Sequence, residues 1–248
     1  MSLRSGLNWN KIGQELSIVF RKIHSKHNSM SPRERLELSA KWMEKMIQEV
    51  HATDNTADYP MIQRYMEMRK PEDERLKKIE KAVQRDIASF LKEEVISASS
   101  FSAGTNLVGD SDLDFNVPIS PMDTLNLVRL ANLCGQNGYT FDDVRNPESP
   151  NLHFVFQKVV EGVEIEIKLN NRDPYMAVMN RVHSYLDHDM LAKDKEGITW
   201  MKYKFKNLSR NTNVPKNAAK QYYNEFKVMY YEYALYHAGV NQMLYPLN

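Results

Sequence analysis

The spacing of apolar residues predicts helices over the first 95 residues. The stretch SPRE at 31–34 has the form of a helix-capping box with proline at the first helical position, and apolar residues then recur at helical spacing as far as Val50. The polar stretch HATDNTADYP predicts a loop. A second long helix is expected to begin at Pro71, because acidic residues at 72–74 suit the first turn of a helix. Its apolar stripe is Leu76, Ile79, Val83, Ile87, Phe90 and Leu91.

From Val95 the pattern changes to the alternation that is typical of strands. Predicted strands are VISASS, DLDFNVPI, YTFDDV, LHFVFQKVV and VEIEIKLN. Between the second and third of these, SPMD at 120–123 predicts a helix start, and this helix ends near Gly138. Helices return after residue 174, first to about His188 and then over 216–237, with KDKEG and SRNTNVPKN as connections.

These elements predict an α+β fold with a small mixed sheet flanked by helices. We expect an N-terminal helical region over residues 1–70, a core that contains the sheet over 71–190, and a C-terminal helical region over 191–248.

Composition narrows the class of protein. The net charge of +1, from 33 basic and 32 acidic residues, argues against a surface that is positive everywhere, although a local basic groove is compatible with it. A single cysteine, Cys134, excludes an internal disulfide framework. No apolar run is long enough to cross a bilayer, and the first residues lack the apolar stretch of a secretory signal. We therefore expect a soluble, cytoplasmic protein with no membrane partner.

Two aspartates, Asp112 and Asp114, begin the strand DLDFNVPI. Residues two apart in a strand point to the same face, so these carboxylates lie side by side, which is costly unless a cation separates them. Mg²⁺ binds through one or two carboxylates and takes its other ligands from water and substrate phosphates. The upstream residues Ser99, Ser100, Gly104 and Thr105 form a loop of hydroxyls and glycine that suits phosphate.

A third carboxylate would allow two metal ions to act on a phosphoryl transfer. In VEIEIKLN, Glu164, Glu166 and Lys168 share one face, and the alternation does not choose between the two glutamates.

Together these residues resemble the signature of the nucleotidyltransferase superfamily related to DNA polymerase β. In its pattern G-S-x-x-x-G-T followed by S-D-x-D, Ser99 stands where glycine is usual, and Ser100, Gly104, Thr105 and the stretch SDLD from Ser111 match. The segment EIKLNN is similar to the D-I-S-x-N-N element of non-standard poly(A) polymerases and terminal uridylyltransferases, with Glu166 where aspartate is usual.

The resemblance implies a metal-dependent enzyme that moves a nucleoside monophosphate from an NTP, such as ATP, to an acceptor hydroxyl and releases pyrophosphate. It assigns Asp112, Asp114 and Glu166 as catalytic residues and ligands of Mg²⁺ or Mn²⁺ in a two-metal site. Triphosphate binding is assigned to the loop, that is, to Ser99, Ser100, Gly104, Thr105 and Ser111. The third-strand element favours an RNA 3′ end as acceptor.

Several alternatives stay open at this point. Lys202, in WMKYKFKNLSR, is a candidate phosphate ligand, but this stretch also fits an element with one solvated cationic face and one buried aromatic face. The acceptor could instead be a small molecule, a protein or a second nucleotide. A catalytically silent module that keeps the fold and binds a nucleotide is the alternative from a different functional class.

Overall fold

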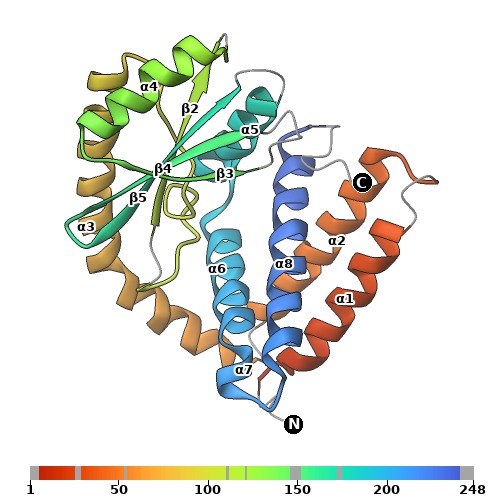
Figure 1. Ribbon diagram of the computed structural model, residues 1–248. Coiled ribbons are helices and arrows are strands. Elements are labelled where there is room, and N and C mark those ends of the chain that lie inside the picture. The colour runs from red at the N-terminus through yellow and green to blue at the C-terminus, as the bar shows by residue number, and fades with distance from the viewer. Residues whose placement is uncertain are drawn as a thin grey trace. The chain divides into compact units, whose positions relative to one another are not determined.

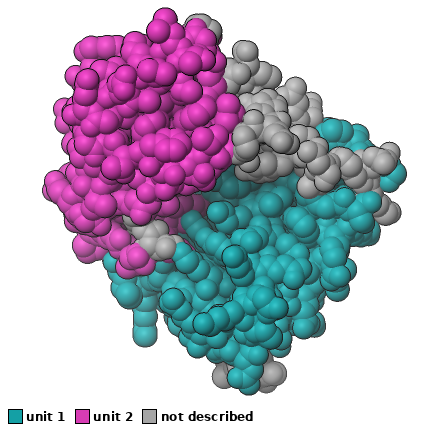
Figure 2. Space-filling view, in the orientation of Figure 1, with its two compact units in different colours: residues 1–68, 184–248 teal, residues 69–183 magenta. Residues whose placement is uncertain are grey.

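The computed structural model describes residues 6–25, 29–52, 55–109, 112–120, 122–145, 152–171 and 175–240. The chain forms two compact units, which are coloured separately in Figure 2. Residues 69–183 form one, here called the sheet unit. Residues 1–68 and 184–248 form the other, here called the helical unit, so the N-terminal and C-terminal helical segments belong together.

The sheet unit contains a five-stranded mixed sheet in the order β1-β2-β5-β4-β3 (Figure 1). The strands are β1 (Ile96–Ser97), β2 (Asp112–Ile119), β3 (Thr140–Arg145), β4 (His153–Val160) and β5 (Val163–Asn171). β2 and β5 pair in parallel, whereas the other neighbouring strands pair antiparallel. The predicted α+β class with a small mixed sheet is confirmed.

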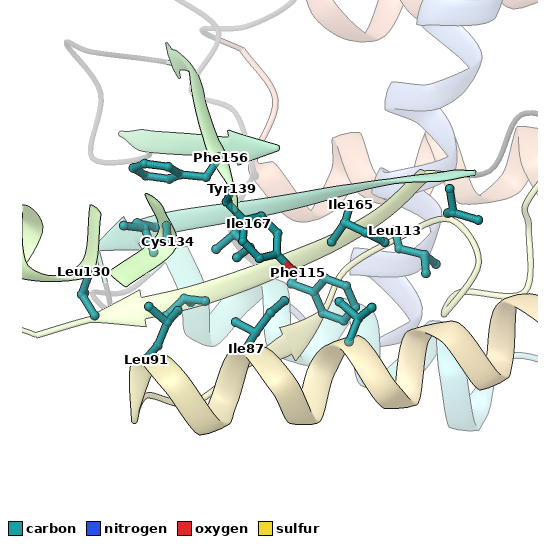
Figure 3. Close-up of a cluster of buried hydrophobic side chains, with 14 of the residues drawn as sticks. Ile87, Leu91, Leu113, Phe115, Leu130, Cys134, Tyr139, Phe156, Ile165 and Ile167 are labelled. Atoms are coloured by element: carbon teal, nitrogen blue, oxygen red, sulfur yellow. The ribbon is translucent and has the colours of Figure 1, made fainter. Parts of the chain in front are cut away.

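One face of this sheet packs into the apolar core of the unit. The odd-numbered residues over 113–119 of β2 and 163–169 of β5, such as Phe115 and Ile165, are buried there. Figure 3 shows Ile87 and Leu91 of α3 (Asp58–Leu91) next to these strands, together with Leu130 of α4 (Thr124–Gln136). Because α3 and α4 take up the apolar face, the even-numbered residues of β2 and β5 face the other side. A further helix, α5 (Tyr175–Ser184), follows β5.

The helical unit is built from helices that pack chiefly on α8 (Lys216–His237), with α1, α2 and α6 against it. Its elements before α8 are α1 (Trp9–Ser25), α2 (Pro32–Val50), the start of α3, the π-helical turn η1 (Tyr185–Asp189), α6 (Ala192–Lys206) and α7 (Leu208–Asn211). Among the helices that the structure describes, none combines the length and the apolar character that a membrane span requires.

The predicted helix boundaries are partly right. The capping box before α2 is confirmed, because Ser31 and Glu34 bond reciprocally. The predicted start of the next helix at Pro71 is wrong, since α3 begins at Asp58 and contains Pro71 in its interior. The Asn55 side chain accepts from the Asp58 N–H and caps this earlier start.

Two further segments differ from prediction. The stretch KDKEG, expected as a connection, lies inside α6. A Cβ on Gly197 would come within 3.3 Å of the His51 ring and 3.4 Å of Ile47, so this glycine allows α6 and α2 to pack closely rather than marking a turn. Of the predicted strand VISASS, only Ile96–Ser97 forms a strand. The chain then continues into residues 98–105, here called the serine-rich loop.

Candidate active site

The paired aspartates lie on the face of β2 opposite the apolar core, at the start of the strand, where this face is accessible. Leu113 and Phe115 are fully buried, whereas Asp112 is exposed and Asp114 is partly buried. The parallel register places Asp112 beside Glu164 and Asp114 beside Glu166. Glu164 is exposed, whereas Glu166 is buried. Glu166 is therefore the glutamate that lies directly beside Asp114.

A lysine occupies the space between the two inner carboxylates. Lys168 Nζ donates to Asp114 Oδ1 at 2.6 Å and lies 3.2 Å from Glu166 Oε2. Lys168 reaches both because it follows Glu166 by two residues on the same face of β5. This ammonium thus places one positive charge between the two carboxylates.

The Glu166 carboxylate is also held from the neighbouring strands. Arg145, at the end of β3, donates to both of its oxygens, at 2.9 and 3.2 Å. Gln157 of β4 donates to Glu166 Oε1 at 3.1 Å. Both oxygens of Glu166 therefore accept hydrogen bonds from protein groups.

The two inner carboxyl groups have opposite pKa shifts. Burial raises the pKa of Asp114 to about 6, and the charge of Asp112 adds to this, although Lys168 opposes it. Burial also acts to raise the pKa of Glu166, but the bonds from Arg145 and the charge of Lys168 outweigh it and lower that pKa to about 2. Glu166 is thus a stable anion, whereas the Asp114 anion is short of positive charge.

These geometries decide how a metal ion would fit. Within the described ranges, no group of three or more acidic, histidine or cysteine side chains is arranged to hold a metal ion. Asp112 and Asp114, on one face of one strand, fit the one or two carboxylates through which Mg²⁺ binds. Glu166 does not fit as a further ligand while Arg145, Gln157 and Lys168 hold its oxygens. Its predicted role as a metal ligand stays a prediction.

The serine-rich loop begins beside Asp114, because the Ala98 N–H donates to the Asp114 carbonyl oxygen at 2.8 Å. Ser99 is buried, and its hydroxyl oxygen accepts from the Ser102 N–H at 3.1 Å, as the first residue before a helical turn does. Ser100 follows as the first residue of that turn and is partly exposed. The hydroxyl of Ser99 is therefore turned into the loop.

Gly104 and Thr105 end the same turn. Gly104 has a φ of 68°, in the left-handed region that favours glycine. Its N–H donates to the Phe101 carbonyl at 2.8 Å, and the Thr105 N–H donates to the Ser100 carbonyl at 2.9 Å. This is the hydrogen-bonding pattern of a helix C-cap. These two N–H groups, predicted to hold phosphate, could do so only if these internal bonds were exchanged.

Arg69, which the sequence did not single out, anchors the end of the loop. Its guanidinium donates to the Gly104 carbonyl at 3.3 Å and to the Asn106 side chain, and it lies 3.3 Å from Asp73. Asn106 also donates to Asp73 at 2.9 Å. The loop is therefore tied to the side of α3, at residues that give no motif signal in the sequence.

The remaining predicted residues are Ser111 and Lys202. Ser111 lies outside the described residues. Lys202 belongs to α6, in the helical unit, and its phosphate contact stays a prediction. Arg145 was also missed: the predicted strand YTFDDV stops one residue before it, whereas β3 includes it.

Comparisons with known proteins give weak structural likenesses. No protein-family model and no curated protein matches the chain. The chain is similar to terminal uridylyl transferase 4 from Trypanosoma brucei with bound CTP, with 16% identity over 60% of this chain and 51% of that one, and a TM-score of 0.39. It is also similar to a cytoplasmic RNA terminal U-transferase, with 14% identity over 78% of this chain and 51% of that one, and a TM-score of 0.40. The chain spans about half the length of these solved chains.

Proposed function

We propose that the protein is a metal-dependent nucleotidyltransferase that moves a nucleoside monophosphate from an NTP to an acceptor hydroxyl and releases pyrophosphate. The observation that carries this proposal is the position of the carboxylates. Asp112 and Asp114 lie at the start of β2, on the face opposite the apolar core, and the serine-rich loop is joined to Asp114 by the Ala98 hydrogen bond. A site for a divalent ion and a site for phosphate are thereby next to each other.

Each group in the cluster has a role that its surroundings support. Asp112 and Asp114 would hold the divalent ion, which when bound would neutralise phosphate charge and polarise the reacting oxygens. Ser100, partly exposed at the start of the loop turn, would donate its hydroxyl to the terminal phosphates. Arg69 would keep the loop in place through Gly104 and Asn106. Glu166 stands beside Asp114 as the third acid of the site.

The proposed acceptor is an RNA 3′ end, because of the resemblance of EIKLNN to the third-strand element of RNA-tailing enzymes. A small molecule, a protein or a second nucleotide is the alternative acceptor.

A catalytically silent nucleotide-binding module is the second candidate, and two observations favour it. Glu166 is fully hydrogen-bonded by protein groups, and the N–H groups of Gly104 and Thr105 bond inside the loop. Such a protein would bind the nucleotide without turnover.

One experiment separates these functions. The protein is incubated with each labelled NTP, Mg²⁺ or Mn²⁺ and a pool of short RNAs, beside the Asp112→Ala/Asp114→Ala double variant and an Asp86→Ala control, which removes an exposed acid of α3. Transfer by the wild type and the control that the double variant loses supports the enzyme. Binding of NTP without transfer under every condition supports the silent module and contradicts the catalytic proposal.

A further inference from the structure

The position of Lys168 bears on how many metal ions the site binds. A second divalent ion would need a further carboxylate ligand beside Asp112 and Asp114, and Glu166 is the candidate. In this protein the Lys168 ammonium is in direct contact with two of these carboxylates, at 2.6 Å from Asp114 and 3.2 Å from Glu166.

The lysine is held firmly in this position. Its side chain is 19% exposed, and those of Asp114 and Glu166 are 16% and 9% exposed. Its ammonium lies between two carboxylates, and opposite charges at these distances favour the charged forms of both partners. To leave, it would have to give up two ion pairs in a partly buried site, which is expensive when no other partner replaces them.

Glu166 is likewise paired with the protein's own cations, Arg145 and Lys168. Arg145 binds both of its oxygens, and a paired arrangement of this kind is among the stronger side-chain interactions. Two divalent ions added to the charged Lys168 and Arg145 would place six positive charges beside the three carboxylates of Asp112, Asp114 and Glu166. One divalent ion at Asp112 and Asp114 avoids this excess of charge.

We propose that Lys168 supplies the second positive charge of the site, so that the protein binds one divalent cation, at Asp112 and Asp114. Glu166 is then a positioning residue that anchors Lys168, and Arg145 keeps Glu166 in place. The inference rests on the proposed function, because that function defines the ion's site.

The number of bound ions tests the proposal without any measurement of activity. Mn²⁺ is titrated into the protein without nucleotide, and free Mn²⁺ is followed by electron paramagnetic resonance. We expect one Mn²⁺ per chain for the wild type and for Lys168→Arg, which keeps the charge. We expect two for Lys168→Met, which opens the space between Asp114 and Glu166.

Three further variants complete the design. Lys158→Met is the matched control, because Lys158 lies on the neighbouring strand opposite Ile165 and donates to the Asn137 carbonyl, away from the acids. This variant should still bind one ion. Asp112→Asn should weaken Mn²⁺ binding at least tenfold. Glu166→Gln should weaken it less than threefold, because an anchor of Lys168 does not coordinate the ion. Thermal unfolding followed by circular dichroism confirms that each variant is folded.

Two ions or none on the wild type, or one ion on a folded Lys168→Met, would overturn the proposal. A tenfold loss of affinity in Glu166→Gln would make Glu166 a ligand and would also overturn it. The outcome is separate from that of the transfer assay. A protein that transfers nucleotides but binds two ions keeps the proposed function, whereas one that binds a single ion with the expected variant pattern and transfers nothing keeps the single-ion site.

Discussion

Two aspartates, the buried Asp58 of the helical unit and the partly buried Asp114 of the sheet unit, both contact a lysine and yet differ in the direction of their pKa shifts. Asp58, in the helical unit, binds Lys204 at 3.0 Å, and Asp114, in the sheet unit, binds Lys168 at 2.6 Å. The pKa of Asp58 is lowered, whereas that of Asp114 is raised to about 6. A lysine partner therefore does not by itself decide how well a buried carboxylate is stabilised.

The difference lies in the other neighbours. Asp58 also accepts from the Leu7 N–H at 2.9 Å and from the indole N–H groups of Trp200 and Trp9 at 3.0 and 3.3 Å. These bonds, with Lys204, outweigh the effect of burial. Asp114 instead has the carboxylates of Asp112 and Glu166 beside it. The charge of Asp58 is stabilised fully by its protein partners. A further cation beside Asp114 would stabilise the charged form of that carboxyl group.

The largest effect on stability is expected from Asp58→Ala. The variant leaves Lys204 and two indole N–H groups without their acceptor, and breaking a buried pair in this way costs about 3–5 kcal/mol. Urea unfolding followed by tryptophan fluorescence measures it, because Trp9, Trp42 and Trp200, the protein's three tryptophans, all belong to the helical unit. The matched control is Glu37→Ala, which breaks the exposed pair with Lys41 and should change nothing measurable. A loss below about 1 kcal/mol for Asp58→Ala would contradict the structural role.

Glu232 tests whether the direction of a pKa shift depends on the neighbouring groups or on the unit in which the carboxyl group lies. It lies in the helical unit, as Asp58 does, but burial raises its pKa to about 7 despite the Ser39 hydroxyl and the charge of Arg35. The folded state then binds a proton more tightly than the unfolded state, so its contribution to stability falls as the pH rises from about 4.5 to 7 and is constant above that range.

We therefore expect the advantage of Glu232→Gln over the wild type to grow by about 2–3 kcal/mol across that range. Urea unfolding of both proteins at several pH values, followed by tryptophan fluorescence, measures the difference. A difference that does not depend on pH would show that Glu232 does not titrate there.

A smaller effect, opposite in sign to that of Asp58→Ala, is expected from Asp114→Asn. Asparagine carries no charge beside Asp112 and Glu166, so the free energy of unfolding at pH 7 should rise by about 1–2 kcal/mol, after the loss of the Lys168 pair. The single cysteine, Cys134, is buried in the sheet unit, and its labelling by a thiol reagent in urea reports unfolding of that unit.

Millimolar Mn²⁺ should reverse this ranking, since an ion that binds the folded wild type stabilises it and the variant lacks one ligand. A loss of stability in Asp114→Asn without metal would instead make Asp114 a structural residue like Asp58.

Local patterns in the sequence were sufficient for the parts of the site that lie within one strand. Alternation predicted that Asp112 and Asp114 share a face and that Leu113 and Phe115 enter the core, and the burial of these residues agrees. Alternation is a property of the strand itself, so no knowledge of the fold was needed.

The contacts between strands could not be predicted in this way. The register that pairs Asp114 with Glu166 joins residues 52 positions apart and depends on how the whole sheet packs. Lys168 was known to share a face with Glu166, but its contact with Asp114 follows from that register. Arg145 reaches Glu166 from β3, through β4, which no local pattern indicates.

The smallest expected effect concerns Ser99, where the related motif has glycine. Its hydroxyl oxygen caps the turn at Ser102, so Ser99→Ala should cost about 1 kcal/mol, and Ser99→Gly only a few tenths, because glycine is tolerated at this position. Thiol labelling of Cys134 in urea measures both variants. Because the side chain is buried in the loop, we also expect Ser99→Gly to leave the rate of nucleotidyl transfer within about twofold of the wild type, a difference below about 0.5 kcal/mol in the activation barrier. A tenfold gain in rate would show that the Ser99 side chain obstructs the phosphate, and would make the loop, rather than the carboxylates, the element that limits this site.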